Sequence, residues 1–442
     1  MPVDRPAGLQ RREKSSHEIM PTESRAVDQH QDRTGPERRG GDTTESKNPP
    51  ALLPGSERLR LSRRNAMQFG SSLLCGFVLP AALAATTRAA WGGNIRVGFI
   101  NPWGPPEFWQ LVSATMRAAA AELGIEVEER HTERSFDRAI AFARDFLNQR
   151  PPPDYLIATN DVGVGGELIK LADAARVPLI LLNNELEGKQ WAEYGQPRTK
   201  YRHWLGSIVP DHESGGYGIA EAVLIEAARI KKHRPLKLVA LAGEIDTPAS
   251  NERLRGLKRA IGVMSKLLGP NSVDLVDVRN LDWSEKRAEA SMREFVQNGP
   301  RIDALWAAND PMAIGGVTAL REAGYRPGVD VLVGGLNWSQ AAVDQVLKGE
   351  MVLTHGGHFL LGAWAMVILR DYHDGRDFAE EDVRLQFPMG AFDLPVARRF
   401  PEIGKVDWRR VEFARFSKTR NPAVTRYNFT PDAVLSRLPP NQ

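Results

Sequence analysis

The sequence has 442 residues, which is long enough for a leader segment and two domains of ordinary size. Its formal net charge is +3, and residues 1–66 carry 13 Lys and Arg against 10 Asp and Glu, so the remainder is close to neutral. This balance does not favour a polyanionic partner such as nucleic acid, and a single cysteine, Cys75, excludes an intramolecular disulfide.

Residues 1–60 are predicted to be a disordered leader, because they are rich in charged residues, Ser, Gly and Pro and lack the aromatic residues of a core. Residues 61–90 have the order of a twin-arginine signal peptide. Ser62, Arg63 and Arg64 precede an apolar run from Phe69 to Ala85, and small-residue cleavage points follow at 82–84 and 87–89. We therefore expect an exported, periplasmic protein.

A membrane anchor is the alternative interpretation of this apolar run, but the run is short and contains Gly76 and Pro80. Cys75 lies inside it, and the large residues Leu73 and Leu74 before the cysteine do not fit a lipidation site. If the signal peptide is cleaved, the mature chain has no cysteine, which excludes a thiolate metal site and a thiol nucleophile.

Strands and helices are predicted to alternate along the rest of the chain, from short apolar runs and from apolar stripes at helical spacing. Strands are expected near residues 95–101, 125–130, 155–159, 178–182, 203–209, 236–243, 273–279, 303–308, 329–335 and 351–355, and helices near 109–123, 135–149, 165–175, 214–230, 250–261, 284–297, 311–323, 339–348 and 360–373. Alternation predicts parallel sheet with right-handed crossovers, and about ten units exceed one sheet, so we expect two doubly wound α/β lobes. The tail from Asp393 to Gln442 is expected to be irregular.

Five of the predicted strands end in asparagine or aspartate. The first ends at Asn101 and is followed by Phe108 and Trp109; the others end at Asn160-Asp161, Asn183-Asn184, Asn309-Asp310 and Asn337-Trp338. Because ligands of open α/β sheets bind outside the carboxyl ends of the strands, this pattern predicts one cleft lined by amides, carboxylates and aromatic rings. At any single position, capping of the next helix is the alternative role for Asn or Asp.

Enzyme motifs are weak in this sequence. Gly163-Val164-Gly165-Gly166 follows a strand, but Leu168 stands where a dinucleotide fingerprint needs its third glycine, and no Gly-x-Ser-x-Gly elbow occurs. His355 and His358 form a pair without a nearby carboxylate or third ligand, which is weak for a metal. We predict neither a catalytic residue nor a metal or cofactor. We place His355 at a strand end facing the cleft, with a simple polar cap as its alternative role.

Residues 94–392 resemble the type-I periplasmic sugar-binding proteins, the ribose-binding-like substrate-binding proteins of ABC transporters. The resemblance rests on FINP…FW, ASNERLRGLKRA, ALWAANDPMAIGG, VLVGGLNW and GGHFLLGAWAMVILRDYHDG, in this order. It is closest to the branch that contains the LuxP-like autoinducer receptor. Relatives that act as repressors carry a DNA-binding helix-turn-helix in front, where this chain has an export signal.

The resemblance implies two α/β lobes joined by three crossing strands, with crossings near Val209–Asp211, His355–Gly357 and Met389–Gly390. The first lobe would comprise residues 94–209 and 357–389, and the second residues 210–356 and 390–420. Residues 421–442 would form a C-terminal tail.

The resemblance also implies positions for the ligand contacts. The first aromatic clamp falls on Phe108 and Trp109, and an Asp-Arg pair of the family falls on Asn183 and Asn184. The arginine of the second lobe falls on Arg253, and the aromatic residue that faces the clamp falls on Trp283. The Asn-Asp pair of the family falls on Asn309 and Asp310. Its last cleft aspartate falls on Asn337, with Trp338 beside it. Two acidic acceptors and one arginine of the family are thus amides here. Amides still pair with hydroxyls as donor and acceptor, although a plain aldopentose or hexose fits this departure less well.

Other roles remain open for several of these residues. Core packing is the alternative role for Trp109 and Trp338. Asp310 opens a helix, so its alternative role is to stabilise the positive end of the helix dipole. Arg253 lies on a basic helix with Arg255, and the other basic residues of this helix are expected to face solvent.

The expected function is a monomeric solute-binding protein that encloses a small carbohydrate-like ligand and delivers it to an inner-membrane ABC permease. A periplasmic sensor subunit that presents its ligand-closed form to a membrane kinase or chemoreceptor is the alternative. A secreted carbohydrate-active enzyme is a third hypothesis, from a different class.

Overall fold

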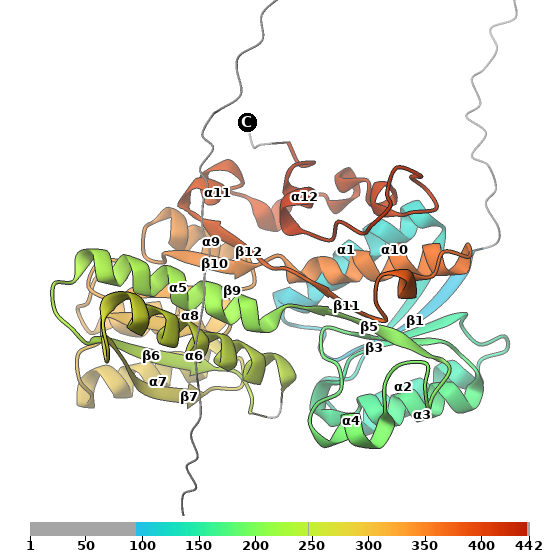
Figure 1. Cartoon of the computed structure of the whole chain (residues 1–442), viewed down its shortest axis with the longest axis horizontal. Helices are drawn as coiled ribbons and strands as arrows, with labels where there is room; N and C mark the ends of the chain where they lie inside the picture. The colour runs from blue at the N-terminus through green and yellow to red at the C-terminus, as the bar shows by residue number, and fades with distance from the viewer. Residues whose placement is uncertain (1–93, 246, 440–442) are drawn as a thin grey trace, which may run out of the picture. The chain divides into compact units, whose positions relative to one another are not determined.

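Two six-stranded sheets organise the residues that the computed structural model describes, 94–245 and 247–439 (Figure 1). The predicted leader, 1–60, and the predicted signal peptide, 61–90, lie outside these residues. The first sheet has the order β11-β5-β4-β3-β1-β2, with β1 (Ile95–Asn101), β2 (Ile125–His131), β3 (Tyr155–Ala158), β4 (Leu179–Leu182), β5 (Trp204–Pro210) and β11 (Arg384–Phe387). The second has the order β12-β10-β9-β8-β6-β7, with β6 (Leu236–Ala242), β7 (Val273–Asn280), β8 (Ala304–Ala307), β9 (Leu332–Leu336), β10 (Leu353–Gly356) and β12 (Gly390–Asp393).

Helices cover both faces of each sheet, as a doubly wound parallel fold requires. In the first lobe, α1 (Glu107–Leu123) and α10 (Leu361–His373) pack together on one face, and α2 (Phe136–Asn148), α3 (Gly165–Ala175) and the short α4 (Lys189–Tyr194) lie on the other (Figure 1). In the second lobe, α5 (His212–Ile230) packs with α6 (Pro248–Leu268), while α7 (Glu285–Asn298), α8 (Asp310–Glu322) and α9 (Gln340–Leu347) pack in series.

The predicted fold class is confirmed. All strand pairs within the two sheets are parallel except the pair of β10 with β12, which is antiparallel. The central strands are short and apolar: β3, β4 and β8 are buried along their whole length, as expected for strands covered on both faces.

The chain passes between the two sheets three times. It leaves the first sheet after β5, returns after β10 to form α10 on the first lobe, and crosses again between Phe387 at the end of β11 and Gly390 at the start of β12. Strands β11 and β12 are four residues each and were not predicted as strands, because segments this short show no clear period.

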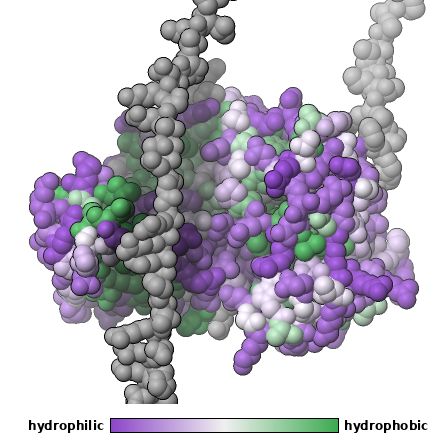
Figure 2. Space-filling model, viewed as in Figure 1, coloured by the Kyte–Doolittle hydropathy of each residue, from purple (hydrophilic) through white to green (hydrophobic). Residues whose placement is uncertain are grey.

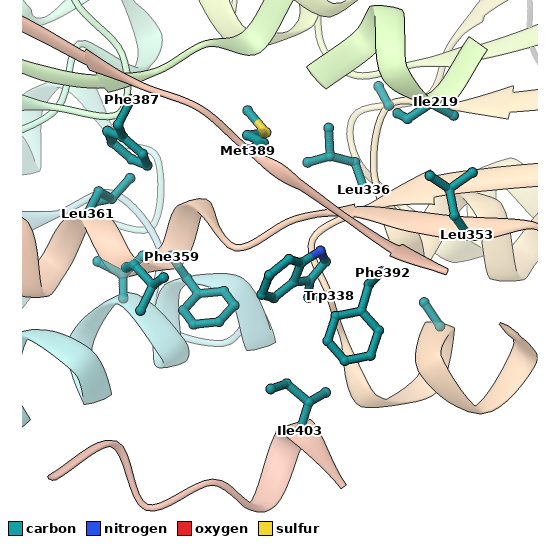
Figure 3. Close-up of a cluster of buried hydrophobic side chains, with 14 of the residues drawn as sticks. Ile219, Leu336, Trp338, Leu353, Phe359, Leu361, Phe387, Met389, Phe392 and Ile403 are labelled. Carbon is teal, nitrogen blue, oxygen red and sulfur yellow. The ribbon is translucent and has the colours of Figure 1, made fainter. Parts of the chain in front are cut away.

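A hydrophobic cluster fills the space beside these crossings (Figure 3). The ring of Trp338 packs edge-on against Phe392, with ring centroids 4.9 Å apart, and against Phe359 at 6.4 Å. Met389 from the crossing and Ile403 from the C-terminal segment are buried in the same cluster. One continuous core thus joins the crossings to both lobes.

The C-terminal segment departs from its predicted assignment. We expected residues 390–420 in the second lobe, and α11 (Leu394–Arg399) does pack on α9. However, the 3₁₀ turns Trp408–Val411 and Phe413–Phe416 pack on α1 of the first lobe, where the backbone N–H of Ala414 donates to the Glu122 carboxylate at 3.0 Å.

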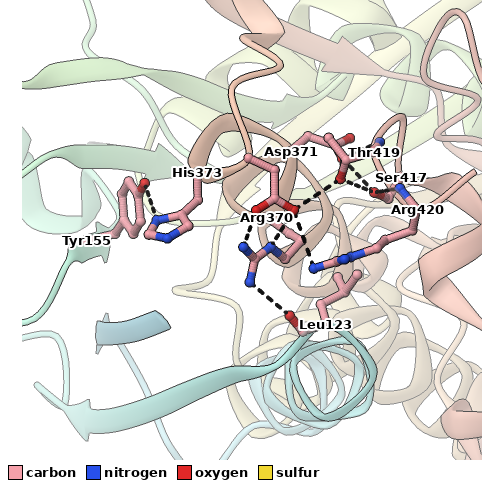
Figure 4. Close-up of polar contacts among 9 residues, drawn as sticks. Leu123, Tyr155, Arg370, Asp371, His373, Ser417, Thr419 and Arg420 are labelled. Atoms are coloured by element: carbon pink, nitrogen blue, oxygen red, sulfur yellow. Dashed lines mark hydrogen bonds and ion pairs between the residues drawn. The ribbon is translucent and has the colours of Figure 1, made fainter. Parts of the chain in front are cut away.

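A buried carboxylate on the first lobe holds this segment in place. Asp371 of α10 lies beside Ser417 and Thr419 and accepts hydrogen bonds from their hydroxyls (Figure 4). It also accepts from the hydroxyl of Tyr427 and from the backbone N–H groups of Lys418 and Thr419. Five donors therefore satisfy one carboxylate that is fully buried.

The predicted irregular tail is also folded against the core. The ring of Phe429 stacks on Trp364 of α10 at 4.5 Å, and a short helix, α12 (Pro431–Leu435), places Val434 and Leu435 in buried positions. Helices this short carry no strong periodic signal, so the sequence alone did not predict them.

The face of the molecule shown in Figure 2 is mostly hydrophilic, with hydrophobic residues in separate patches. Within the described residues, the large apolar side chains that are exposed lie on different elements: Phe136, Ile225, Ile245, Leu267, Val329 and Leu347. No helix of this part of the chain combines the length and apolar character that a membrane span needs.

Candidate functional site

A cavity of about 270 Å³ lies between residues that follow the strands of the two sheets. Its walls come from the β1–α1 loop and α1, from the ends of β2, β3 and β4, and from the second-lobe segments after β6, β7, β8 and β9. Small-molecule sites in proteins have volumes of about 300–1,000 Å³, so this cavity suits a small ligand.

Eight of the twelve predicted site residues line this cavity. They are Phe108, Trp109, Asn183, Asn184, Arg253, Trp283, Asn309 and Asn337. They come from both lobes and lie far apart in the sequence. The segments chosen from the strand ends and from the resemblance therefore meet around one cavity. That these residues contact a ligand remains a prediction.

The other four predicted residues do not line the cavity, and two of them support the backbone beside it. Asn101 is fully buried; its amide donates to Glu129 at 2.7 Å and to Ser113, and its oxygen accepts from the backbone N–H of Trp103. Asp310 is fully buried and accepts from Thr354 at 2.7 Å and from the N–H and hydroxyl of Ser339 at 2.9 Å.

Trp338 and His355 also lie behind the cavity wall. Trp338 is a core aromatic, 2% exposed, and its indole N–H donates to the carbonyl of Gly390 at 3.0 Å. His355 packs against Gly218 of α5, where a Cβ would approach its ring within 2.7 Å. These four residues are thus absent from the cavity lining: buried partners hold the polar atoms of Asn101, Asp310 and Trp338, and His355 packs against α5.

Aromatic rings form much of the apolar wall. The rings of Phe108 and Trp109 meet edge-to-face at 5.1 Å, and Phe108 stacks on the imidazole of His358 at 4.4 Å. Trp283 lies against Gly243, where a Cβ would come within 2.3 Å of the indole, so glycine at 243 makes room for this ring. Such flat apolar faces suit the C–H faces of a sugar ring as well as other flat ligands.

Arg253 is the central polar residue of the cavity. Arg253 is only 4% exposed. Its guanidinium donates to the carbonyl of Ala308 at 2.7 Å and to ring nitrogens of His212 and His358 at 3.2 and 3.1 Å. The guanidinium also lies over the Trp283 ring, 5.4 Å from its centroid. Burial lowers the pKa of Arg253 to about 9, because the charged group is removed from water.

The contacts of Arg253 fix the state of both histidines. Arginine is only a donor, so Nδ1 of His212 and Nε2 of His358 accept and both rings are neutral. Nε2–H of His212 then donates to the carbonyl of Asn183 at 3.1 Å. Burial and the nearby guanidinium hold the pKa of each imidazole well below its usual range.

Several buried polar atoms of cavity residues have no hydrogen-bond partner in the described part of the chain. They are Nε of Arg253, Nδ1 of His358 and the side-chain oxygens of Asn183 and Asn184. An unpaired buried polar atom costs about 1–3 kcal/mol, and native structures rarely leave several together. A polar ligand that supplies both acceptors and donors would satisfy this set.

Asn309 has a mixed role. Its oxygen accepts from the backbone N–H of Met312 at 2.9 Å and so caps α8, while its amide nitrogen donates to the carbonyl of Trp283 at 3.0 Å. The capping interpretation is therefore correct for Asn309, although the residue also lines the cavity. The side chain of Asn337 is partly buried and has no hydrogen bond to another described residue.

An arginine that sequence analysis missed connects the lobes beside the cavity. Arg134, after β2, is hydrogen-bonded to Asp161 of the same lobe at 3.1 Å, and to Asp282 at 2.9 Å and Glu244 in the second lobe. Arg134 has a left-handed backbone, φ 57°, which is unusual for a residue with a long side chain. Strained backbone of this kind is common at ligand sites.

Other cavity residues were also missed, among them Trp103, Glu107, Thr247, Ser339 and His358. Trp103 and Glu107 flank the predicted clamp, so extending that segment by a few residues would have found them. His358 appeared only as half of a weak metal pair. In the described residues no group of His, Cys, Asp and Glu is arranged to hold a metal ion.

Comparison with known proteins identifies the family of this fold. The model of the periplasmic binding protein domain matches residues 97–377. The chain belongs to this family. It is similar to the galactofuranose-binding protein YtfQ of Escherichia coli, with 24% identity over 62% of this chain and 80% of YtfQ, and to the ribose import binding protein RbsB of the same organism, with 24% identity over 64% and 85%.

A solved structure shows a stronger likeness. A periplasmic sugar-binding protein from Pseudomonas fluorescens is 30% identical, with a TM-score of 0.69, and the match covers 77% of this chain and 99% of that protein. These three relatives are named as sugar-binding or sugar-import proteins and not as enzymes.

Proposed function

We propose that the chain is an exported solute-binding protein that captures a small sugar or sugar-like ligand between its two lobes and delivers it to an ABC permease. The observation that carries this proposal is the cavity between the lobes, where an arginine, two asparagines and a histidine leave polar atoms unpaired next to stacked aromatic rings. A polyhydroxylated ring offers hydroxyls to such atoms and apolar faces to the aromatics.

The relatives support the class of ligand. YtfQ is named as a galactofuranose-binding protein and RbsB as a ribose import binding protein, and both ligands are small sugars. The amides Asn183 and Asn184 at predicted contact positions and the burial of Asp310 away from the cavity support a ligand other than a plain aldose. We further propose that the chain acts as a monomer in the periplasm after export by the twin-arginine route.

Calorimetric titration against a panel of small sugars, sugar acids and polyols tests the binding role. We expect one ligand per chain, recovered chemically unchanged. Asn183→Ala and Asn184→Ala should weaken binding, whereas Asn298→Ala, at the exposed end of α7, serves as a control that should not. If no member of the panel binds, or if the ligand is recovered as a reaction product, the proposal fails.

Uptake of the labelled ligand tests delivery. Cells that lack this chain should lose uptake and regain it with the intact gene. Replacement of Arg63 and Arg64 by Lys should leave the precursor in the cytoplasm and abolish uptake. Uptake that continues unchanged without the chain, together with a lost transcriptional response to the ligand, would favour the sensor alternative.

A further inference from the structure

We propose that the ligand is a small polyhydroxylated carboxylate, the acid form of a sugar, and that its carboxylate pairs with Arg253. This proposal rests on the proposed function, because it names the chemical class of the ligand for the same cavity. It requires that Arg253 has no ion pair within the chain, and that the cavity offers both unpaired donors and unpaired acceptors.

Among the described residues of the cavity wall, Arg253 is the buried charged residue that forms no ion pair. In the described part of the chain no carboxylate forms an ion pair with its guanidinium, and its hydrogen-bond partners are a carbonyl and two neutral imidazoles. Glu252 and Asp310 act on its charge only from a longer distance. By contrast, Asp161 is paired with Arg134 at 3.1 Å, and Arg134 is shared with two further carboxylates. Glu107 is exposed and accepts from the N–H of Gln340.

A buried cation without a counter-ion is costly, because the protein interior stabilises charge far less than water does. A neutral hydroxyl would accept a hydrogen bond from Arg253 but would leave its charge uncompensated. A ligand carboxylate would supply both the acceptor and the missing negative charge, in the charge-assisted geometry that guanidinium groups favour.

The unpaired donors indicate the same type of group. Nε–H of Arg253 has no partner, and the tautomer of His358 leaves Nδ1–H as a second unpaired donor, since Nε2 already accepts from Arg253. An ionised carboxylate is only an acceptor, with two oxygens that serve two such donors.

The remaining part of the cavity suits hydroxyl groups. The side-chain oxygens of Asn183 and Asn184 are buried acceptors without donors, and hydroxyls would donate to them. The rings of Trp109 and Trp283 add apolar faces to the same cavity. A carboxylate on Arg253 and hydroxyls on the asparagine oxygens together describe a sugar acid.

Matched pairs of ligands test this proposal directly on the unaltered protein. The pairs are D-glucose, D-galactose, D-xylose and L-arabinose, each titrated beside its aldonate, with D-glucuronate and D-galacturonate added for the two hexoses. At pH 7 we expect the best acid to bind at least about tenfold tighter than its neutral partner, and the difference to shrink as salt is raised.

Two variants connect that preference to Arg253. Arg253→Gln should reduce affinity for the acid by about tenfold to a hundredfold and remove the preference over the neutral partner, whereas Arg253→Lys should retain part of it. Arg255→Gln removes a charge from the exposed face of the same helix and should change neither value.

The outcomes separate this proposal from the proposed function. If a neutral sugar binds tighter than its acid, the inference is wrong and the sugar-binding role stands. If the acid binds but Arg253→Gln keeps the full preference, the assignment of Arg253 is wrong. If no member of any pair binds, the result counts against the proposed function as well.

Discussion

Removal of Arg134 should weaken ligand binding by destabilising the closed arrangement of the lobes. Of its three partners, Asp161 lies in the same lobe, whereas Asp282 and Glu244 lie in the second lobe. Only the last two contacts depend on how the lobes meet. In Arg134→Ala, the interactions lost between the lobes are therefore these two ion pairs.

The size of the effect follows from the exposure of these groups. The Arg134 side chain is 15% exposed, and those of Asp282 and Glu244 are 39% and 38% exposed. Partly exposed ion pairs contribute about 0.2–1 kcal/mol each, so the two pairs together contribute about 1–2 kcal/mol at most. If ligand binds the closed form, its affinity should fall by up to about 5- to 30-fold, and less at high salt.

Calorimetry and small-angle scattering measure the two parts of this prediction. We expect the radius of gyration of the intact protein to decrease when ligand saturates it, and Arg134→Ala to need more ligand for the same decrease. Arg130→Ala is the matched control, because Arg130 lies on the same segment but pairs with Glu128 and Asp145 within the first lobe. Equal affinity and equal scattering curves for the two variants would refute the reasoning.

Three further perturbations follow from the same structure. Burial and the nearby charge of Arg253 lower the pKa of His355 from 6.5 to about 4, so its contribution to stability is complete above pH 6.5 and is lost as pH falls toward 4, by up to about 3 kcal/mol. His355→Gln should flatten the melting temperature over that range, and an unchanged slope would count against this assignment. Trp338→Ala should cost about 3–5 kcal/mol of stability as a core deletion, whereas Trp283→Ala should reduce binding with a smaller loss in thermal melts; the reverse order would contradict the placement of the two rings. Asp371→Ala should lower the melting temperature and expose the C-terminal segment to proteolysis, because five donors lose their acceptor; resistance equal to that of the parent would show that the segment is held by its apolar contacts alone.

The regular elements were predictable because hydrophobic period and strand length depend on local sequence. The ten predicted strands all occur, with ends within a few residues of the expected ones. The prediction ended α6 at Ile261, although the helix continues past Gly262 to Leu268. A Cβ at Gly262 would meet open space, so this glycine marks an exposed position within the helix.

The site was only partly predictable, because a strand end places a residue near a cavity without deciding which way its side chain turns. Asn183 and Asn337 line the cavity, while Asn101 and Asp310, at equivalent strand ends, turn to buried partners. The role of Arg134 depends on Asp282 of the other lobe, more than a hundred residues later, and no local pattern encodes a pair at that separation.

The C-terminal segment affects how the lobes can move, because it is attached to both of them. Gln340 of α9 in the second lobe bonds to the carbonyl of Pro401 and the N–H of Gly404, each within 3.0 Å. Beyond this point the segment is held on α10 of the first lobe by Asp371. Rotation of one lobe against the other must therefore carry or bend the stretch between these two attachments. If the lobes close about the crossings, the attached segment is a further connection on which that closure must act.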